Sequence, residues 1–423
     1  MKTWGIETKC IHEGYKPENG EPHIVPIVQS TTYRYDSTEH VAQLFDLEVA
    51  GHMYSRISNP TVEVVENKIA ALEGGVGALC TSSGQSATLL AILNICESGD
   101  HIISSSNIYG GTFNLFNMTI KKMGIETTFI DPDATVEEMK AAFKTNTKLV
   151  FAETIANPKL SVLDFDKFVS VAHEQNVPLF VDNTFATPVL CRPIEFGADI
   201  VIHSTTKYLD GHAASMGGVI VDSGKFDWSS GNYPGLTTPD PSYHGIVYSE
   251  NFGEAAFIVK ARVQGLRDIG SCLSPNNAFI MNLGMETLHL RMERHCENAL
   301  KVAKFLQSSP KIESVSYPSL EGDEYYDLAS KYLPKGSSGV ISIVVAGGKE
   351  AAIKFMDKLE LASIVVHVSD LRTLVLHPAS STHRQLSDDQ LENAGIKPGL
   401  IRLSVGIENV DDIIEDLKLS LED

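Results

Sequence analysis

Short apolar runs alternate with longer stretches of mixed polarity between residues 63 and 225. Apolar strands separated by amphipathic helices are typical of an α/β fold, in which helices cover both faces of a mostly parallel sheet. The last connection, 207–217, is too short for a helical crossover, so the seventh strand is expected to run antiparallel. The seven expected strands cover residues 78–81, 102–105, 127–130, 149–153, 179–182, 200–203 and 218–221.

Three further segments flank this pattern. Residues 1–62 are rich in polar and turn-forming residues, which predicts an extended arm that needs another body to order it. Residues 223–250 are rich in proline, glycine and aromatic residues, as lids and interface loops often are. One or two long helices are predicted over 276–308, followed by a smaller α+β region. Its expected elements are strands over 340–345, 363–367, 374–377 and 401–405 and a closing helix over 410–421.

The size of the chain supports this division. A chain of 423 residues is too long for one simple core. We therefore expect an N-terminal arm (1–62), a large domain (63–275) and a small C-terminal domain (276–423). Hydrophobic residues make up 43% and charged residues 21%, which is ordinary for a soluble enzyme.

Charge and cysteine usage narrow the partners and the compartment. The chain has 34 basic and 54 acidic residues and a net charge of −20, which repels nucleic acid and anionic membranes. No apolar signal core and no apolar run long enough to span a membrane is apparent. The six cysteines are scattered without a C-x-x-C motif, as expected of buried, reduced thiols in a cytoplasmic protein. No histidine or cysteine spacing predicts a metal site.

The strongest chemical signal follows two neighbouring apolar strands. The strand over 200–203 runs into Ser204, Thr205, Thr206 and Lys207, and the strand over 179–182 ends at Asp182. Ligands of open α/β sheets bind at the carboxyl ends of the strands. A lysine amine can form a Schiff base with pyridoxal phosphate, and an aspartate can keep the pyridine nitrogen of that cofactor protonated. Alone, the lysine is more often a surface charge and the aspartate a turn former.

Three other positions fit such a site. Ser83, Gly84 and Gln85 lie in a turn before a helix expected over 87–96, where free N–H groups suit a phosphate, although plain helix capping by Ser82 or Ser83 is the alternative. Tyr109 follows the second strand and can stack on an aromatic cofactor or cap the core. Arg402 interrupts an apolar strand, so it needs either a substrate carboxylate or an internal acid as its partner.

The order of these motifs resembles the Cys/Met-metabolism family of pyridoxal-phosphate enzymes over essentially the whole chain. The resemblance implies a type I aminotransferase-like fold with pyridoxal 5'-phosphate bound to Lys207. It further implies that Asn157 lies near the phenolic oxygen of the cofactor and that Tyr54 and Arg56 reach the cofactor phosphate of a neighbouring subunit. The expected assembly is a homotetramer built as a dimer of dimers. The implied site residues are catalytic Lys207, Tyr109 and Asp182; cofactor-binding Ser83, Gly84, Gln85, Asn157, Ser204, Thr206, Tyr54 and Arg56; and substrate-binding Arg402 and Tyr54.

The insertion over 233–244 separates the activities found in the family. It is similar to that of members that replace the γ-acetoxy group of O-acetyl-L-homoserine with sulfide or methanethiol. Members that cleave methionine carry a cysteine where this chain has Gly111. His367 aligns with a position at which many members have serine, which leaves its part in holding the substrate carboxylate open.

Several alternatives stay open. Within the family they are methionine γ-lyase and cystathionine γ-synthase activity. From other classes they are an NAD-dependent oxidoreductase and a binding protein without catalysis. The oxidoreductase is disfavoured because the glycines at Gly75 and Gly77 are not followed by the third glycine of the dinucleotide fingerprint.

Overall fold

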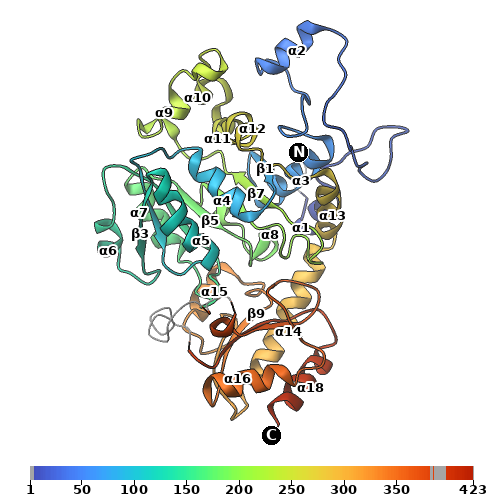
Figure 1. The fold of residues 1–423 in the computed structure, drawn as a ribbon, viewed down its shortest axis with the longest axis vertical. Helices are drawn as coiled ribbons and strands as arrows, with labels where there is room; N and C mark the ends of the chain where they lie inside the picture. The colour runs from blue at the N-terminus through green and yellow to red at the C-terminus, as the bar shows by residue number, and fades with distance from the viewer. Residues whose placement is uncertain (1–3, 382–383, 385–396, 423) are drawn as a thin grey trace.

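Two sheets organise the protein (Figure 1). The computed structural model describes residues 4–381, 384 and 397–422. The large sheet has seven strands in the order β1-β7-β6-β5-β4-β2-β3, and the small sheet has five in the order β10-β11-β12-β9-β8. The helix α14 (Leu288–Gln307) leads from the large domain into the small one.

The strands of the large sheet confirm the predicted pattern. They are β1 (Gly77–Thr81), β2 (His101–Ser105), β3 (Glu126–Ile130), β4 (Thr147–Glu153), β5 (Leu179–Asp182), β6 (Ile200–His203) and β7 (Gly218–Asp222). The pairs β2–β3, β2–β4, β4–β5 and β5–β6 are parallel. Strand β7 is antiparallel to both β6 and β1, as its short connection predicts.

Both faces of the large sheet are buried. In β5, Phe180 packs into one apolar cluster and Val181 into another, because successive side chains of a strand point to opposite faces. Helices on both sides complete these clusters, which is why the strands read as continuous apolar runs. The helix α3 (Pro60–Glu73) starts where Asn59 accepts the Thr61 N–H, with proline as its first residue.

The remaining helices have the following bounds. Before and within the large domain they are α1 (Ile6–His12), α2 (Thr38–Phe45), α4 (Gly84–Leu93), α5 (Gly110–Asn114), α6 (Val136–Ala141), α7 (Phe165–Glu174), α8 (Thr187–Leu190), α9 (Pro234–Thr237), α10 (Tyr248–Phe252), α11 (Ala256–Lys260), α12 (Arg267–Ile269) and α13 (Pro275–Glu286). In the small domain they are α15 (Tyr326–Tyr332), α16 (Gly348–Asp357) and α18 (Val410–Leu421). The helix α4 begins three residues before the predicted start at 87, because Ser83 caps it.

The small sheet packs against α14, α16 and α18 around its own apolar core. Its strands are β8 (Ile312–Ser316), β9 (Val340–Val345), β10 (Ser363–Ile364), β11 (Leu374–Leu376) and β12 (Leu400–Ser404). The expected strand over 363–367 is therefore too long, and His367 lies in the loop that follows β10. Strand β8 was not predicted, because it is a partly exposed edge strand with little apolar signal.

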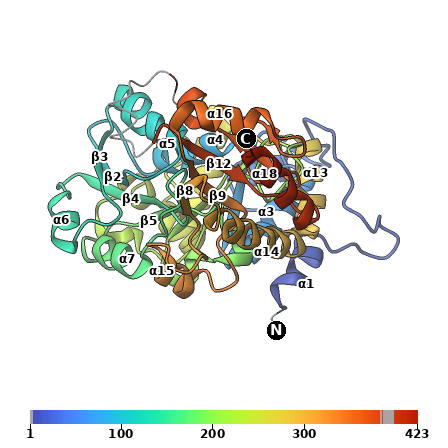
Figure 2. The same ribbon diagram turned by 90° about the horizontal axis from the view of Figure 1, so that it is seen from below.

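The N-terminal segment begins with the short helix α1, which packs on α3, α13 and α14 and buries Cys10 in the apolar core. The stretch that follows includes α2 and projects from this body, and Figure 2 shows it reaching past α13. Apolar side chains such as Ile24 and Phe45 are each 56% exposed on this segment. None of the helices described has the length and apolarity needed to cross a bilayer.

Candidate active site

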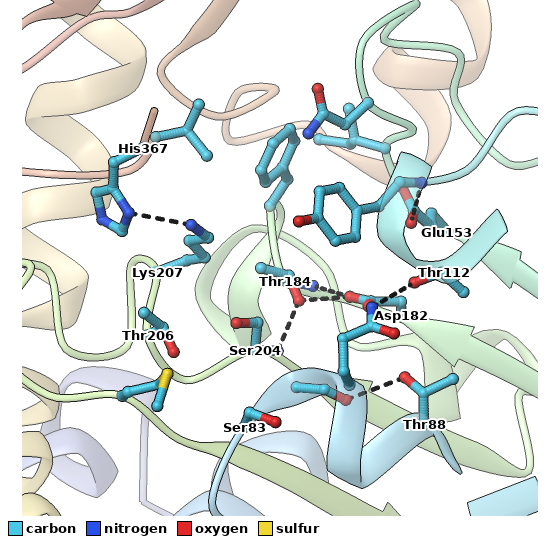
Figure 3. Close-up of a pocket in the computed structure, with 18 of the residues that line it drawn as sticks. Ser83, Thr88, Thr112, Glu153, Asp182, Thr184, Ser204, Thr206, Lys207 and His367 are labelled. Atoms are coloured by element: carbon cyan, nitrogen blue, oxygen red, sulfur yellow. Dashed lines mark hydrogen bonds between the residues drawn. The ribbon is translucent and has the colours of Figure 1, made fainter. Parts of the chain in front are cut away.

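A cavity opens at the carboxyl ends of β4, β5 and β6, where the large domain meets the small one (Figure 3). It brings together residues that lie more than 300 positions apart in the chain. Of the predicted site residues, its lining includes Ser83, Gly84, Gln85, Tyr109, Asn157, Asp182, Ser204, Thr206, Lys207 and Arg402. His367 also lines it.

The turn into α4 caps the helix and lies at one end of the cavity. The Ser83 hydroxyl accepts the N–H of Ser86 at 3.1 Å, which confirms that Ser83 caps the helix. Gly84 packs so tightly on the next loop that a Cβ there would lie 2.7 Å from the Cβ of Ser204. The hydroxyl of Thr206 lines the same end of the cavity, beside the helix N-terminus. Hydroxyls and a helix N-terminus together suit a phosphate.

Asp182 is held by a residue that sequence reasoning missed. Its Oδ1 accepts the backbone N–H of Thr184 at 2.9 Å and the Thr184 hydroxyl at 2.5 Å. The same hydroxyl accepts the N–H of Ser204 at 2.9 Å, which ties the end of β5 to the loop that carries Lys207. Burial raises the pKa of Asp182, while the two hydrogen bonds from Thr184 lower it. An aspartate–x–threonine sequence after a strand was the available signal.

Glu153 is a second carboxyl group in the cavity wall, and it too was missed as a functional candidate. It pairs with Asp182 in the register of β4 and β5. Burial, and then the charge of Asp182, raise its pKa well above the usual value. Its Oε1 accepts the backbone N–H of Tyr109 at 2.7 Å. Glu153 therefore fixes the loop from which the Tyr109 side chain enters the site.

The Tyr109 ring is half exposed and lies over a glycine. A Cβ on Gly111 would come within 2.4 Å of the Tyr109 ring carbon Cε1, so this ring position requires glycine there. The ring lines the cavity and is free to contact a planar ligand.

Arg402 enters the cavity from β12 of the small domain. One of its terminal nitrogens, Nη1, donates to Asn157 Oδ1 at 3.1 Å. Its Nε is buried without a hydrogen-bond partner in the part of the chain that the structure describes. Burial lowers the pKa of Arg402 to about 10, and no described carboxylate forms an ion pair with it. The geometry therefore favours a bound carboxylate over the internal ion pair.

Lys207 lies in the turn after β6 and is partly buried. Burial, and to a smaller degree the positive charge of Arg402, lower its pKa from 10.5 to about 8. A lysine with such a pKa has a substantial neutral fraction near neutral pH, which a nucleophilic amine needs. Its Nζ lies 3.1 Å from Nδ1 of His367.

A buried histidine–carboxylate contact lies at the end of β6. His203, the last residue of β6, contacts Glu73 Oε1 through its Nε2 at 2.6 Å, and both side chains are fully buried. Asn183 donates to the same carboxylate oxygen at 2.9 Å. The sequence offered no signal for the histidine–carboxylate contact, because it joins residues 130 positions apart.

The two predicted arm residues lie elsewhere. The guanidinium of Arg56 sits 4.9 Å from the centre of the Tyr54 ring, and its side chain passes near Gly270. Neither residue is among those that line the cavity of their own chain.

The residues of the cavity fit pyridoxal phosphate. They offer a lysine amine of lowered pKa, a buried carboxylate, hydroxyls at a helix N-terminus and an exposed aromatic ring. The chain also matches the family model described as "Cys/Met metabolism PLP-dependent enzyme" over residues 7–422. It therefore belongs to this family of pyridoxal-phosphate-dependent enzymes, as its motifs predicted.

Particular relatives and structures sharpen this picture. The chain is 48% identical to O-acetyl-L-homoserine sulfhydrylase of Leptospira meyeri, over 98% of this chain and 96% of the relative. It is 46% identical to homocysteine synthase of Schizosaccharomyces pombe, over 99% and 98% of the two chains.

Among solved structures, a putative O-acetylhomoserine (thiol)-lyase from Campylobacter jejuni matches with a TM-score of 0.96 and 37% identity. The match covers 99% of this chain and 100% of that one, and that structure carries N'-pyridoxyl-lysine-5'-monophosphate. The predicted fold class is confirmed.

Proposed function

We propose that the enzyme replaces the γ-acetoxy group of O-acetyl-L-homoserine with sulfide or methanethiol. The products are acetate and either homocysteine or methionine. The observation that carries the proposal is the placement of an amine, Lys207, in one cavity with a guanidinium, Arg402, that forms no ion pair with any described carboxylate. This pair can hold an α-amino acid at both of its ends. The choice of ester and nucleophile is supported by relatives that are 44–48% identical over nearly the whole chain.

The chain's own residues divide the work. Bound pyridoxal phosphate supplies a ring that withdraws electrons from the substrate once its Cα–H bond is broken. Lys207 would hold the cofactor through its amine, and its Nζ is the base that takes the Cα proton of the substrate. Arg402 fixes the substrate carboxylate with paired hydrogen bonds, so that the Cα–H bond keeps its orientation.

Other residues set the charge of the cofactor and close the site. Asp182 would keep the ring nitrogen of the cofactor protonated, and Asn157 would hold its phenolic oxygen. Ser83, Gly84, Gln85, Ser204 and Thr206 hold the phosphate. Tyr109 would stack on the ring of the cofactor and, with Tyr54, would stabilise the γ end of the substrate, where acetate leaves and the sulfur nucleophile adds.

The proposal includes the assembly. Tyr54 and Arg56 lie on the arm and away from the cavity of their own chain, so they are available to a neighbouring subunit. Exchange of identical arms suits a symmetric dimer. We place the enzyme in the cytoplasm as a homotetramer, a dimer of dimers, with the arm (1–62) between subunits of each dimer.

A product assay tests the function. The purified enzyme with pyridoxal phosphate is offered O-acetylhomoserine together with sulfide, methanethiol or cysteine, and separately methionine alone. Homocysteine or methionine formed with acetate supports γ-replacement. Cystathionine as the main product reassigns the enzyme to cystathionine γ-synthesis. Rapid 2-oxobutyrate release from methionine reassigns it to the γ-lyases, which Gly111 argues against because it leaves no thiol at that position.

A further inference from the structure

The contact between Lys207 and His367 crosses the boundary between the two domains (Figure 3). Lys207 follows β6 of the large sheet, and His367 follows β10 of the small sheet. The lysine Nζ and the imidazole Nδ1 are 3.1 Å apart, and both side chains line the cavity. The small domain thus places the His367 imidazole within hydrogen-bond distance of the Lys207 amine.

The charge state of His367 sets the direction of this hydrogen bond. Burial, and then the positive charge of Lys207, lower the pKa of the imidazole to about 4, so the ring is neutral at physiological pH. Arg402 acts in the same direction, and the carboxylates of Asp370 and Asp210 act against it. A protonated Lys207 can only donate to Nδ1, and the neutral ring then carries its proton on Nε2. That Nε2 is buried, and no described group forms a hydrogen bond with it.

A buried carboxylate oxygen that also lacks a described partner lies three residues after Lys207. Asp210 is fully buried, and its Oδ1 has no hydrogen-bond partner among the residues described. Its other oxygen, Oδ2, is occupied by the backbone N–H of Ala214 at 2.9 Å and by weaker bonds at 3.3 Å from two neighbouring N–H groups. A buried donor and a buried carboxylate oxygen without partners are each costly, and pairing them removes both costs.

The backbone holds these two groups in one neighbourhood. Gly211 N–H donates to Lys207 O at 2.7 Å, and Leu371 N–H donates to Gly211 O at 3.0 Å. The loop that carries Asp210 is therefore bonded directly to the segment that carries His367. The other nearby acid, Asp370, is already engaged by Arg372 at 3.0 Å.

We propose that Asp210 and His367 form a positioning pair for Lys207, in which Nε2–H of His367 is linked to the Asp210 carboxylate through one water molecule and Nδ1 accepts a hydrogen bond from the lysine amine. The pair fixes the tautomer of the imidazole, since only an unprotonated Nδ1 can accept from the lysine. After the substrate amine has displaced Lys207, this contact holds the free amine at the place from which it takes the Cα proton.

The proton balance is simple. The Cα proton moves to Nζ of Lys207, which becomes an ammonium group, and the electron pair of the broken bond stays with the substrate bound to the cofactor. His367 takes no proton, because its pKa of about 4 is far below the pKa of about 8 of the lysine. The inference rests on the proposed role of Lys207 as the cofactor-binding base, but not on the identity of the γ-leaving group or of the sulfur nucleophile.

Kinetics of four variants test the pair. His367→Ala and Asp210→Asn should each lower kcat by ~10-fold or more, because a misplaced reacting group is costly, and leave KM within about threefold. The double variant should be no worse than His367→Ala alone. His367→Asn, whose amide oxygen can replace the Nδ1 acceptor, should recover much of the loss. The control Asp370→Asn removes the acid paired with Arg372 and should stay within about twofold of the parent.

Two further measurements distinguish a positioning role from a purely structural one, and they do not depend on the complete γ-replacement reaction. Exchange of the Cα proton of 2-aminobutyrate with solvent deuterium needs neither an ester nor a thiol, and it should slow in parallel with kcat. In cofactor-free protein, NMR of isotope-labelled histidine, assigned by difference from His367→Ala, should show an Nε2–H tautomer that Asp210→Asn shifts toward Nδ1–H.

The pair is refuted if Asp210→Asn leaves kcat and Cα exchange unchanged, if its loss adds fully to that of His367→Ala, or if the wild-type ring carries its proton on Nδ1. A raised KM with normal kcat in the His367 variants contradicts it as well, and places His367 on the substrate instead. If the wild type exchanges the Cα proton normally but makes no homocysteine, the proposed function fails while the pair remains testable.

Discussion

Glu153 and Asp182 stand opposite each other at the carboxyl ends of β4 and β5. Burial raises the pKa of both carboxyl groups, and the negative charge of Asp182 raises that of Glu153 further. Thr184 gives Asp182 two hydrogen bonds that favour its charged form. Of the two carboxyl groups, Glu153 is therefore the one that takes up a proton more readily, and Asp182 is the one whose charged form is favoured by hydrogen bonds.

This arrangement predicts opposite outcomes for two isosteric substitutions. Glu153→Gln should keep kcat within about threefold of the parent, because a neutral amide resembles a protonated carboxyl group and still accepts from Tyr109 N–H. Asp182→Asn should lower kcat by ~100-fold or more, because an amide cannot keep the ring nitrogen protonated. Steady-state kinetics at saturating cofactor measure both. Equal losses in the two variants would show that the charge is not confined to Asp182.

Arg402 carries a prediction about substrate affinity. Arg402→Lys keeps the positive charge but loses the two-pronged geometry, so KM for O-acetylhomoserine should rise by ~10-fold or more. The matched control is Arg372→Lys, since Arg372 is 68% exposed and pairs with Asp370 instead. An unchanged KM in Arg402→Lys, with the control also unchanged, would assign Arg402 to fold stability.

The lowered pKa of Lys207 predicts how the cofactor-free enzyme captures pyridoxal phosphate. Only the neutral amine attacks the aldehyde, so the capture rate should rise as pH increases and level off above about 8. An ordinary exposed lysine would go on gaining reactivity up to pH ~10.4. Stopped-flow absorbance across a pH series measures the midpoint, with Lys207→Ala as the control that binds the cofactor without covalent capture. A midpoint near 10 would contradict the buried environment assigned to this amine.

The arm prediction is tested by mixing two inactive proteins. Lys207→Ala and Arg56→Ala should each be nearly inactive alone. In a mixed dimer with exchanged arms, one site would carry both lesions and the other neither, so co-expression should restore a substantial fraction of the activity. If mixed dimers form and remain inactive, Arg56 serves the site of its own chain or none.

The sequence predicted the parts of the fold and site that depend on local order. Buried parallel strands appear in the sequence as apolar runs. Asp182 ends one of these runs, and Lys207 lies in the turn after another. Contacts that depend on strand register or domain docking left no comparable signal. Glu153 became a functional candidate only when β4 was paired with β5. Likewise, the contact of His367 with Lys207 joins residues 160 positions apart on two domains.

The stoichiometry of a single reaction tests the central claim most directly. O-acetylhomoserine is incubated with the enzyme, pyridoxal phosphate and saturating sulfide, and acetate, homocysteine and 2-oxobutyrate are measured together. We predict one homocysteine for each acetate released and almost no 2-oxobutyrate, with both products lost in Lys207→Ala. Acetate matched by 2-oxobutyrate instead, or homocysteine formation that survives the loss of Lys207, would contradict the account.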